Sequence, residues 1–192
     1  MQKQSIIFLC LLFTILLSAC AGIAAAQNSG EPSSAVTPIL DGTTTSEAVS
    51  RTPSADCPLT RPHEAFIPPA PYDTLGFEDS FWFGSSSLWT AIWSDGIWYG
   101  LPYNPGSGYT QKIFGWRDGY VWNEEPQPEL IVTGERLDAE APPLISSQAT
   151  NAYADDIGSA MLVGVDFPTL GCWKITGQYE EAELSFVVWV TP

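Results

Sequence analysis

Beyond residue 60 the chain has no sustained 3.6-residue apolar repeat, and this argues against a helical fold. Prolines and glycines interrupt this part at intervals of roughly ten residues, and the runs between them are rich in Val, Ile, Thr, Trp, Tyr and Phe. Short β-forming runs at that spacing are typical of sandwiches and barrels. The sequence therefore predicts an all-β domain, a single β-sandwich of about seven to nine strands.

The clearest strands lie at the C-terminal end. In residues 183–190, ELSFVVWV, apolar residues alternate on one face. In residues 172–179, CWKITGQY, Trp173 and Ile175 share a face and Cys172 lies on the other. A turn near Glu180 joins these strands into a hairpin. Further strands are predicted at residues 129–136 and 159–167.

Two Asp-Gly pairs predict further hairpins, because glycine readily adopts the positive φ of a tight turn. One turns at residues 94–96 within LWTAIWSDGIWYG, and the other at residues 117–119 within QKIFGWRDGYVW. In the first, Trp89, Ala91 and Trp93 share one face. Leu88, Thr90 and Ile92 share the other, so both faces are apolar. A helix over residues 87–93 is the less favoured alternative.

Charge limits the classes of partner. The chain has 22 acidic and 7 basic residues and a formal net charge of −15. Nucleic-acid binding through phosphate contacts needs clustered Lys and Arg, so no nucleic-acid partner is expected.

The N-terminus has the pattern of a secretory signal: one cation, Lys3, then an apolar run over residues 6–17, then small residues. The run is shorter than the ~20 residues of a membrane-spanning helix. Its end, Leu-Ser-Ala-Cys at residues 17–20, resembles the lipobox of bacterial lipoproteins. That resemblance implies that residues 1–19 are removed and that Cys20 is diacylated. Membrane attachment through this lipid anchor, on the extracytoplasmic face (cell surface or periplasm), is the expected localisation.

Residues 20–58 form a predicted flexible linker. No aromatic residue occurs between residues 21 and 65, and Ser, Thr, Ala, Gly and Pro dominate there. Such a composition buries too little apolar surface to offset chain entropy. The folded domain is therefore expected over residues 59–192.

Cys57 and Cys172 are the cysteines that remain after the signal and the lipidated residue, and in an oxidising compartment they predict one disulfide. Metal binding is a poor alternative, because the single histidine is His63 and no C-x-x-C pair exists. Since Trp173 should face the core, Cys172 should lie on the outer face of its sheet. The disulfide would then hold the entering chain against the outside of the final sheet.

The aromatic residues allow two interpretations. Trp82, Trp89, Trp93 and Trp98 lie within residues 80–100, and in a small sandwich such side chains mostly fill the core. The alternative is a glycan- or cell-wall-binding surface on which rings stack against sugars. The candidate ligand-binding residues of that surface are Trp89, Trp93, Tyr99, Tyr103 and Tyr109.

Catalysis has little support in the sequence. No G-x-S-x-G, H-E-x-x-H or phosphate-binding Gly loop is present, and a nucleophile would have only His63 as its base. A carboxylate-dependent hydrolase using Glu124-Glu125 or Asp155-Asp156 is the second alternative. A calcium site at Asp155, Asp156 and Asp166 lacks EF-hand spacing. No enzyme activity, cofactor or metal is expected.

Residues 167–190, FPTLGCWKITGQYEEAELSFVVWV, resemble the end of immunoglobulin-like domains in uncharacterised bacterial lipoproteins, through Pro168, Gly171, Trp173, Ile175 and Thr176. Residues 112–143 also look like part of such proteins. The resemblance implies an immunoglobulin-like sandwich and an extracytoplasmic address, and it implies no activity. The expected function is a non-catalytic binding or structural role, with a glycan or a protein as the ligand.

Overall fold

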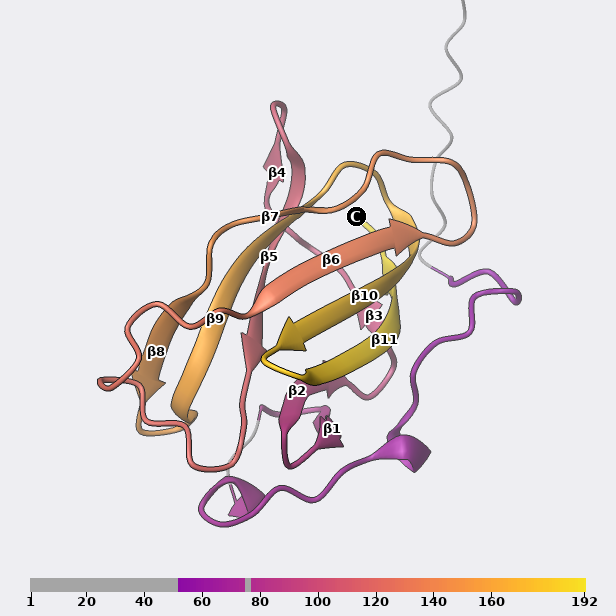
Figure 1. The fold of residues 1–192 in the computed structure, drawn as a ribbon. Helices are drawn as coiled ribbons and strands as arrows, with labels where there is room; N and C mark the ends of the chain where they lie inside the picture. The colour runs from indigo at the N-terminus through magenta and orange to yellow at the C-terminus, as the bar shows by residue number, and fades with distance from the viewer. Residues whose placement is uncertain (1–51, 75–76) are drawn as a thin grey trace, which may run out of the picture. The chain divides into compact units, whose positions relative to one another are not determined.

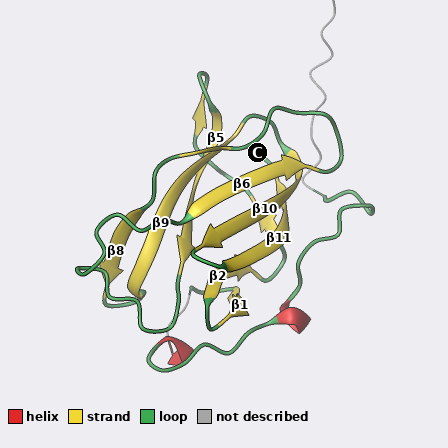
Figure 2. Ribbon diagram, viewed as in Figure 1, coloured by secondary structure: helices red, strands yellow, loops and turns green. Residues whose placement is uncertain are grey.

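The computed structural model describes residues 52–74 and 77–192, which belong to one compact unit. The predicted signal, Cys20 and most of the linker lie outside the described residues. Apart from two 3₁₀ turns, η1 (Pro62–Glu64) and η2 (Tyr72–Thr74), the regular structure is all β (Figure 2). In the described part of the chain no helix has the length and apolarity needed to cross a bilayer. The predicted all-β class is confirmed.

The strands form three hydrogen-bonded groups. Strands β1 (Ser80–Ser85) and β2 (Leu88–Trp93) make an antiparallel hairpin. A four-stranded sheet has the order β3 (Ile97–Trp98), β11 (Ala182–Val190), β10 (Gly171–Tyr179) and β6 (Ile131–Arg136). A five-stranded sheet has the order β4 (Tyr103–Asn104), β5 (Gly108–Gly115), β9 (Gly158–Phe167) and β7 (Ile145–Ser146), with β8 (Thr150–Ala154) also paired to β9.

The predicted C-terminal hairpin is confirmed. Strands β10 and β11 are antiparallel, with Trp173 opposite Val188 and Ile175 opposite Phe186. Glu180 makes the turn with a φ of 51°. Strands β6 and β9 correspond to the predicted strands at residues 129–136 and 159–167. The eleven described strands exceed the expected seven to nine because β3, β4 and β7 have only two residues each.

The main core lies between the four-stranded and five-stranded sheets, which form separate layers in Figure 1. Alternate residues of β10 and β11 point into it from one side, and alternate residues of β9 do so from the other. Trp173 and Phe167, both fully buried, meet edge to face with their ring centroids 5.3 Å apart. The arrangement is that of a sandwich, in which the inner faces of two sheets share one core.

A second apolar cluster covers part of the other face of the five-stranded sheet. Trp89 of β2 and Trp116, just after β5, have no exposed surface and lie at its centre. Tyr72 packs edge-on against Trp89, and the Trp116 indole N–H donates to the Ile157 carbonyl at 3.0 Å. The chain entering the domain contributes as well, because the Phe66 N–H donates to the Trp82 carbonyl. Most of the tryptophan-rich stretch is therefore core.

Both predicted Asp-Gly hairpins are wrong in their pairing. The chain does turn at Gly96, which has a φ of 66°, but β2 pairs with β1. Strand β3 instead joins the four-stranded sheet, where it pairs in parallel with β11. In this pairing Ile97 lies opposite Trp189, and Trp98 lies opposite Val190. Gly119 likewise turns the chain, but the next strand begins only at Ile131, and β5 pairs with β9. A turn signal shows that the chain changes direction, and burial decides which strand it then meets.

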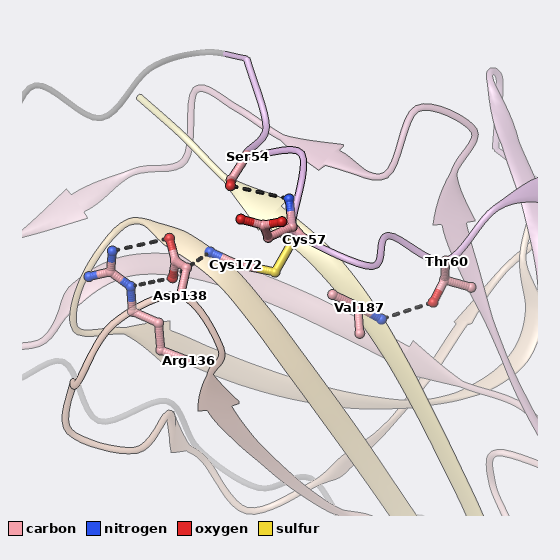
Figure 3. Close-up of a disulfide and its surroundings, with 8 residues drawn as sticks. Ser54, Cys57, Thr60, Arg136, Asp138, Cys172 and Val187 are labelled. Atoms are coloured by element: carbon pink, nitrogen blue, oxygen red, sulfur yellow. Dashed lines mark hydrogen bonds and ion pairs between the residues drawn. A yellow bond between two sulfur atoms is a disulfide. The ribbon is translucent and has the colours of Figure 1, made fainter.

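The predicted disulfide between Cys57 and Cys172 is present, with the Cα atoms 5.8 Å apart (Figure 3). Cys172 packs with Leu59 and Trp189 in a small cluster separate from the main core. Trp173 faces the main core, so the parity prediction is confirmed. The entering chain lies along β11 rather than β10: the Thr60 N–H donates to the Val187 carbonyl, and the Val187 N–H donates to Thr60 Oγ1.

An ion pair lies beside the disulfide. Asp138 Oδ1 accepts from Arg136 Nε at 2.7 Å and from the Cys172 N–H at 3.1 Å (Figure 3). Burial opposes ionisation of Asp138, but the hydrogen bonds from Arg136 and Cys172 outweigh it and hold the pKa of this carboxyl below its usual value. The carboxylate therefore ties the end of β6 to the start of β10.

Candidate binding site

The candidate site begins where β2 separates from β5. Trp89 and Trp116 exchange two backbone hydrogen bonds of 2.9 Å. One residue further along β2, the Thr90 hydroxyl donates to the Phe114 carbonyl at 2.8 Å. At this position a side-chain hydroxyl, and not a backbone N–H, donates to β5. The backbone pairing of β2 with the end of β5 therefore consists of the single bridge between Trp89 and Trp116. The two strands diverge beyond this point.

A cavity of about 170 Å³ lies at this divergence, and we call it the aromatic cleft. Its buried side chains are Thr90, Trp98, Ile113 and Trp116, of which Trp98 and Ile113 also belong to the main core. Phe77, 38% exposed, and Lys112 are its exposed lining residues. The full lining is Phe77, Thr90, Ala91, Trp93, Trp98, Gln111, Lys112, Ile113, Phe114 and Trp116.

Two polar residues of β5, Gln111 and Lys112, line the cleft, and their side chains fall on opposite faces of the strand. Gln111 Oε1 accepts the Lys112 backbone N–H at 2.9 Å, which occupies the amide oxygen. The two N–H bonds of the Gln111 amide have no acceptor within the described part of the chain. The polar groups that remain available on β5 are therefore donors.

Lys112 differs from the other cations of residues 52–74 and 77–192, because its ammonium has no partner there. Arg136 pairs with Asp138, and Lys174 lies 3.6 Å from Glu135. Arg117 covers the ring of Tyr179 at 5.4 Å, and Arg61 donates to the Asp95 carbonyl. The cleft thus has a free positive charge in a strongly acidic protein.

A second hollow, of about 480 Å³, shares Trp93 with the aromatic cleft. It is lined by Glu78, Asp79, Trp93, Ser94, Asp95 and Tyr99, and we call it the acidic hollow. The rings of Trp93 and Tyr99 lie 5.2 Å apart. Trp93 therefore lines both a hollow with three acidic residues and the cleft that Lys112 lines.

The structure distributes the five predicted ligand-binding residues over three places. Trp89 is fully buried in the second cluster and cannot contact a ligand from outside. Trp93 and Tyr99 lie together. Tyr103, 62% exposed, and Tyr109 form another pair, 4.9 Å apart, on the β4–β5 hairpin that projects from the sheet in Figure 1.

Sequence reasoning missed Phe77, Gln111, Lys112 and Phe114. The alternation of β5 was a usable signal for two of them, because Lys112 and Phe114 fall on the face opposite Ile113. Phe77 belongs to no strand, and no local pattern points to it. The divergence of β2 from β5 depends on contacts between distant residues, so the cleft itself left no signature in the sequence.

One residue of each predicted acidic pair accepts a hydrogen bond from a tyrosine. Glu125 Oε2 accepts the Tyr179 hydroxyl at 2.7 Å, and Asp155 Oδ1 accepts the Tyr153 hydroxyl at 3.4 Å. His63 is exposed in the short turn η1. Within residues 52–74 and 77–192 no group of three His, Cys, Asp or Glu side chains is placed to hold a metal ion.

Glu125 instead organises a cluster of tyrosines at the edge of the core. The Tyr120 hydroxyl donates to the Glu125 backbone carbonyl at 3.0 Å, and the Tyr179 hydroxyl donates to the Glu125 carboxylate. Burial, followed by the charge of Glu125, raises the pKa of Tyr120 to about 12. Burial and the hydrogen bond to Glu125 also raise the pKa of Tyr179.

This cluster predicts a loss of stability at alkaline pH. An unfolded tyrosine ionises near pH 10, whereas folded Tyr120 keeps its proton to about pH 12. The contribution of Tyr120 is complete below about pH 10, and it is lost as the pH rises towards the folded value, by up to roughly 2–3 kcal/mol. Urea unfolding measured across this range should show the decline. Tyr120→Phe should flatten it, and an unchanged slope in that variant would assign the decline to other groups.

No protein-family model matches the chain, and neither a curated protein nor a solved structure is significantly similar to it.

Proposed function

We propose that this protein is a lipid-anchored, extracytoplasmic binding protein whose β-sandwich holds a sugar ring of a glycan without cleaving it. The observation that carries the proposal is the aromatic cleft with Trp93 as the wall that it shares with the acidic hollow. The Leu-Ser-Ala-Cys pattern ending at Cys20 supports the anchor. The Cys57–Cys172 disulfide is compatible with an oxidising, exported setting.

The dimensions of the cleft support a single ring as the ligand. An engineered protein cavity of about 150 Å³ holds one benzene molecule, and the aromatic cleft measures about 170 Å³. Aromatic walls with a few polar groups are the usual composition of a small-molecule site. The carboxylates of Glu78, Asp79 and Asp95 next to Trp93 are hydrogen-bond acceptors for hydroxyl groups.

The experiment is a titration of the full chain, in detergent micelles, with a panel of neutral and acidic oligosaccharides, followed by tryptophan fluorescence and calorimetry. Trp93→Ala should weaken binding roughly fivefold, because one ring contact is worth about 1 kcal/mol. Trp122→Ala is the matched control, since Trp122 is an exposed tryptophan that lines neither hollow.

Two results would overturn the proposal. One is the absence of binding to every sugar of the panel by the wild-type chain. The other is an equal loss of binding in Trp93→Ala and Trp122→Ala, since the aromatic cleft would then have no specific role. A circular-dichroism melt of both variants shows whether each remains folded at the temperature of the titration.

A further inference from the structure

Building on the proposed function, we infer that the aromatic cleft selects an acidic sugar, a six-membered ring bearing a carboxylate, and that the Lys112 ammonium is its counter-ion. The inference starts from the free charge of Lys112. The chain has only 7 Lys and Arg against 22 Asp and Glu, and the other described Lys and Arg are all engaged with carboxylates, a carbonyl or a ring. An unpaired lysine in such a chain leaves a positive site for a ligand to neutralise.

The position of Lys112 on β5 places this charge at the cleft. Its backbone N–H is already bonded to Gln111 Oε1, so the two neighbouring residues are linked in one arrangement. That bond directs the Gln111 oxygen to the backbone and leaves the amide N–H groups as donors. The lysine ammonium is a donor, and it suits a carboxylate, which only accepts hydrogen bonds.

The acidic hollow favours one orientation of the bound sugar. Glu78, Asp79 and Asp95 line the acidic hollow, which shares Trp93 with the cleft and is not lined by Lys112. A ligand carboxylate is repelled by these three residues and attracted by Lys112, while hydroxyl groups of the same ligand can donate to them. The ring is thus expected to bind against Trp93 with its carboxylate towards β5 and its hydroxyl groups towards the acidic hollow.

The test compares methyl glucuronide with methyl glucoside, which differ in a carboxylate and a hydroxymethyl group on the same ring. The full chain in a zwitterionic detergent should bind the glucuronide roughly fivefold to tenfold more tightly at low salt. Lys112→Gln should abolish this preference and retain the binding of the neutral sugar, whereas Lys112→Arg should preserve it. The preference should also shrink at about 0.5 M salt, because the pair is screened there. Lys174→Gln is the matched control, since Lys174 lies on β10 and lines no part of the cleft.

The outcomes separate this inference from the proposed function. Equal affinity of the wild-type chain for the two sugars overturns the inference and leaves sugar binding in place. A preference for the glucuronide that persists in Lys112→Gln also overturns it, because another group would then recognise the carboxylate. If the wild-type chain binds neither sugar and also fails to bind acidic and neutral oligomers of the same rings, the proposed function is overturned together with the inference. If neither monomer binds, a preference for the acidic oligomers over the neutral ones supports the inference and identifies a polymer rather than a free uronic acid as the ligand.

Discussion

Removal of the Cys57–Cys172 disulfide is expected to lower the free energy of unfolding by about 4–5 kcal/mol. The bond joins residues 115 positions apart, and in the chain-entropy model a closed loop of that length restricts the unfolded state by this amount. The double variant Cys57→Ala, Cys172→Ala should therefore unfold at a much lower urea concentration than the oxidised protein. Such a loss is a large fraction of the total stability of an ordinary domain.

Loss of the disulfide should also have a local effect on the entering chain, which distinguishes this loss from a general decrease in stability. Without the disulfide, residues 57–60 remain on β11 through Leu59 and the two hydrogen bonds between Thr60 and Val187. Hydrogen exchange at the Thr60 amide should then accelerate more than exchange at the core strand β10. The reduced wild-type protein is the control and should match the double variant. A double variant as stable as the oxidised protein would show that the unfolded chain is not restricted by the bond.

Trp89→Ala is expected to cost about 3–5 kcal/mol of the free energy of unfolding, the usual range for removing a buried large aromatic side chain. Trp89 is fully buried and contacts Phe66 and Tyr72, with ring centroids 5.6 Å away in both cases. Its loss should therefore leave a cavity under the entering chain and loosen the second cluster. Thermal and urea unfolding of the variant would measure the effect.

Two further variants make this prediction specific. Trp89→Phe should cost much less, because it keeps an aromatic ring and removes an indole N–H that has no acceptor within the described part of the chain. Trp122→Ala should also cost little, because Trp122 is 38% exposed and, among the described rings, stacks on exposed Tyr153 alone. If Trp89→Ala unfolded with the wild-type midpoint, the second cluster would contribute nothing to stability.

Local alternation predicted the parts of the fold in which neighbouring strands pair. Trp173 and Ile175 face the core and Cys172 faces outward because side chains alternate along a strand, and that rule needs no knowledge of the partner. The disulfide followed from the same reasoning together with the cysteine count. These predictions depend on interactions that the sequence displays within a few residues.

Pairing between distant segments was beyond that reasoning. Ile97 and Trp98 add to β11 in parallel, more than 80 residues away along the chain, and the Asp95-Gly96 turn before them is compatible with either destination. The candidate site has the same origin, because Lys112 and Trp93 line one cleft through the separation of β2 from β5. Of the predicted ligand-binding residues, only Trp93 lines that cleft, and Trp89 is buried in the second cluster.

The outward position of the disulfide also determines how the domain carries mechanical load. A pulling force applied to the chain before residue 57 reaches Cys172 through a covalent bond, at the start of β10. The segment between the two cysteines, which contains β1 to β9, lies outside the path of tension. A force between the chain before residue 57 and the C-terminal end of β11 would therefore pass through the disulfide and would not extend the aromatic cleft, whose lining residues lie within that segment.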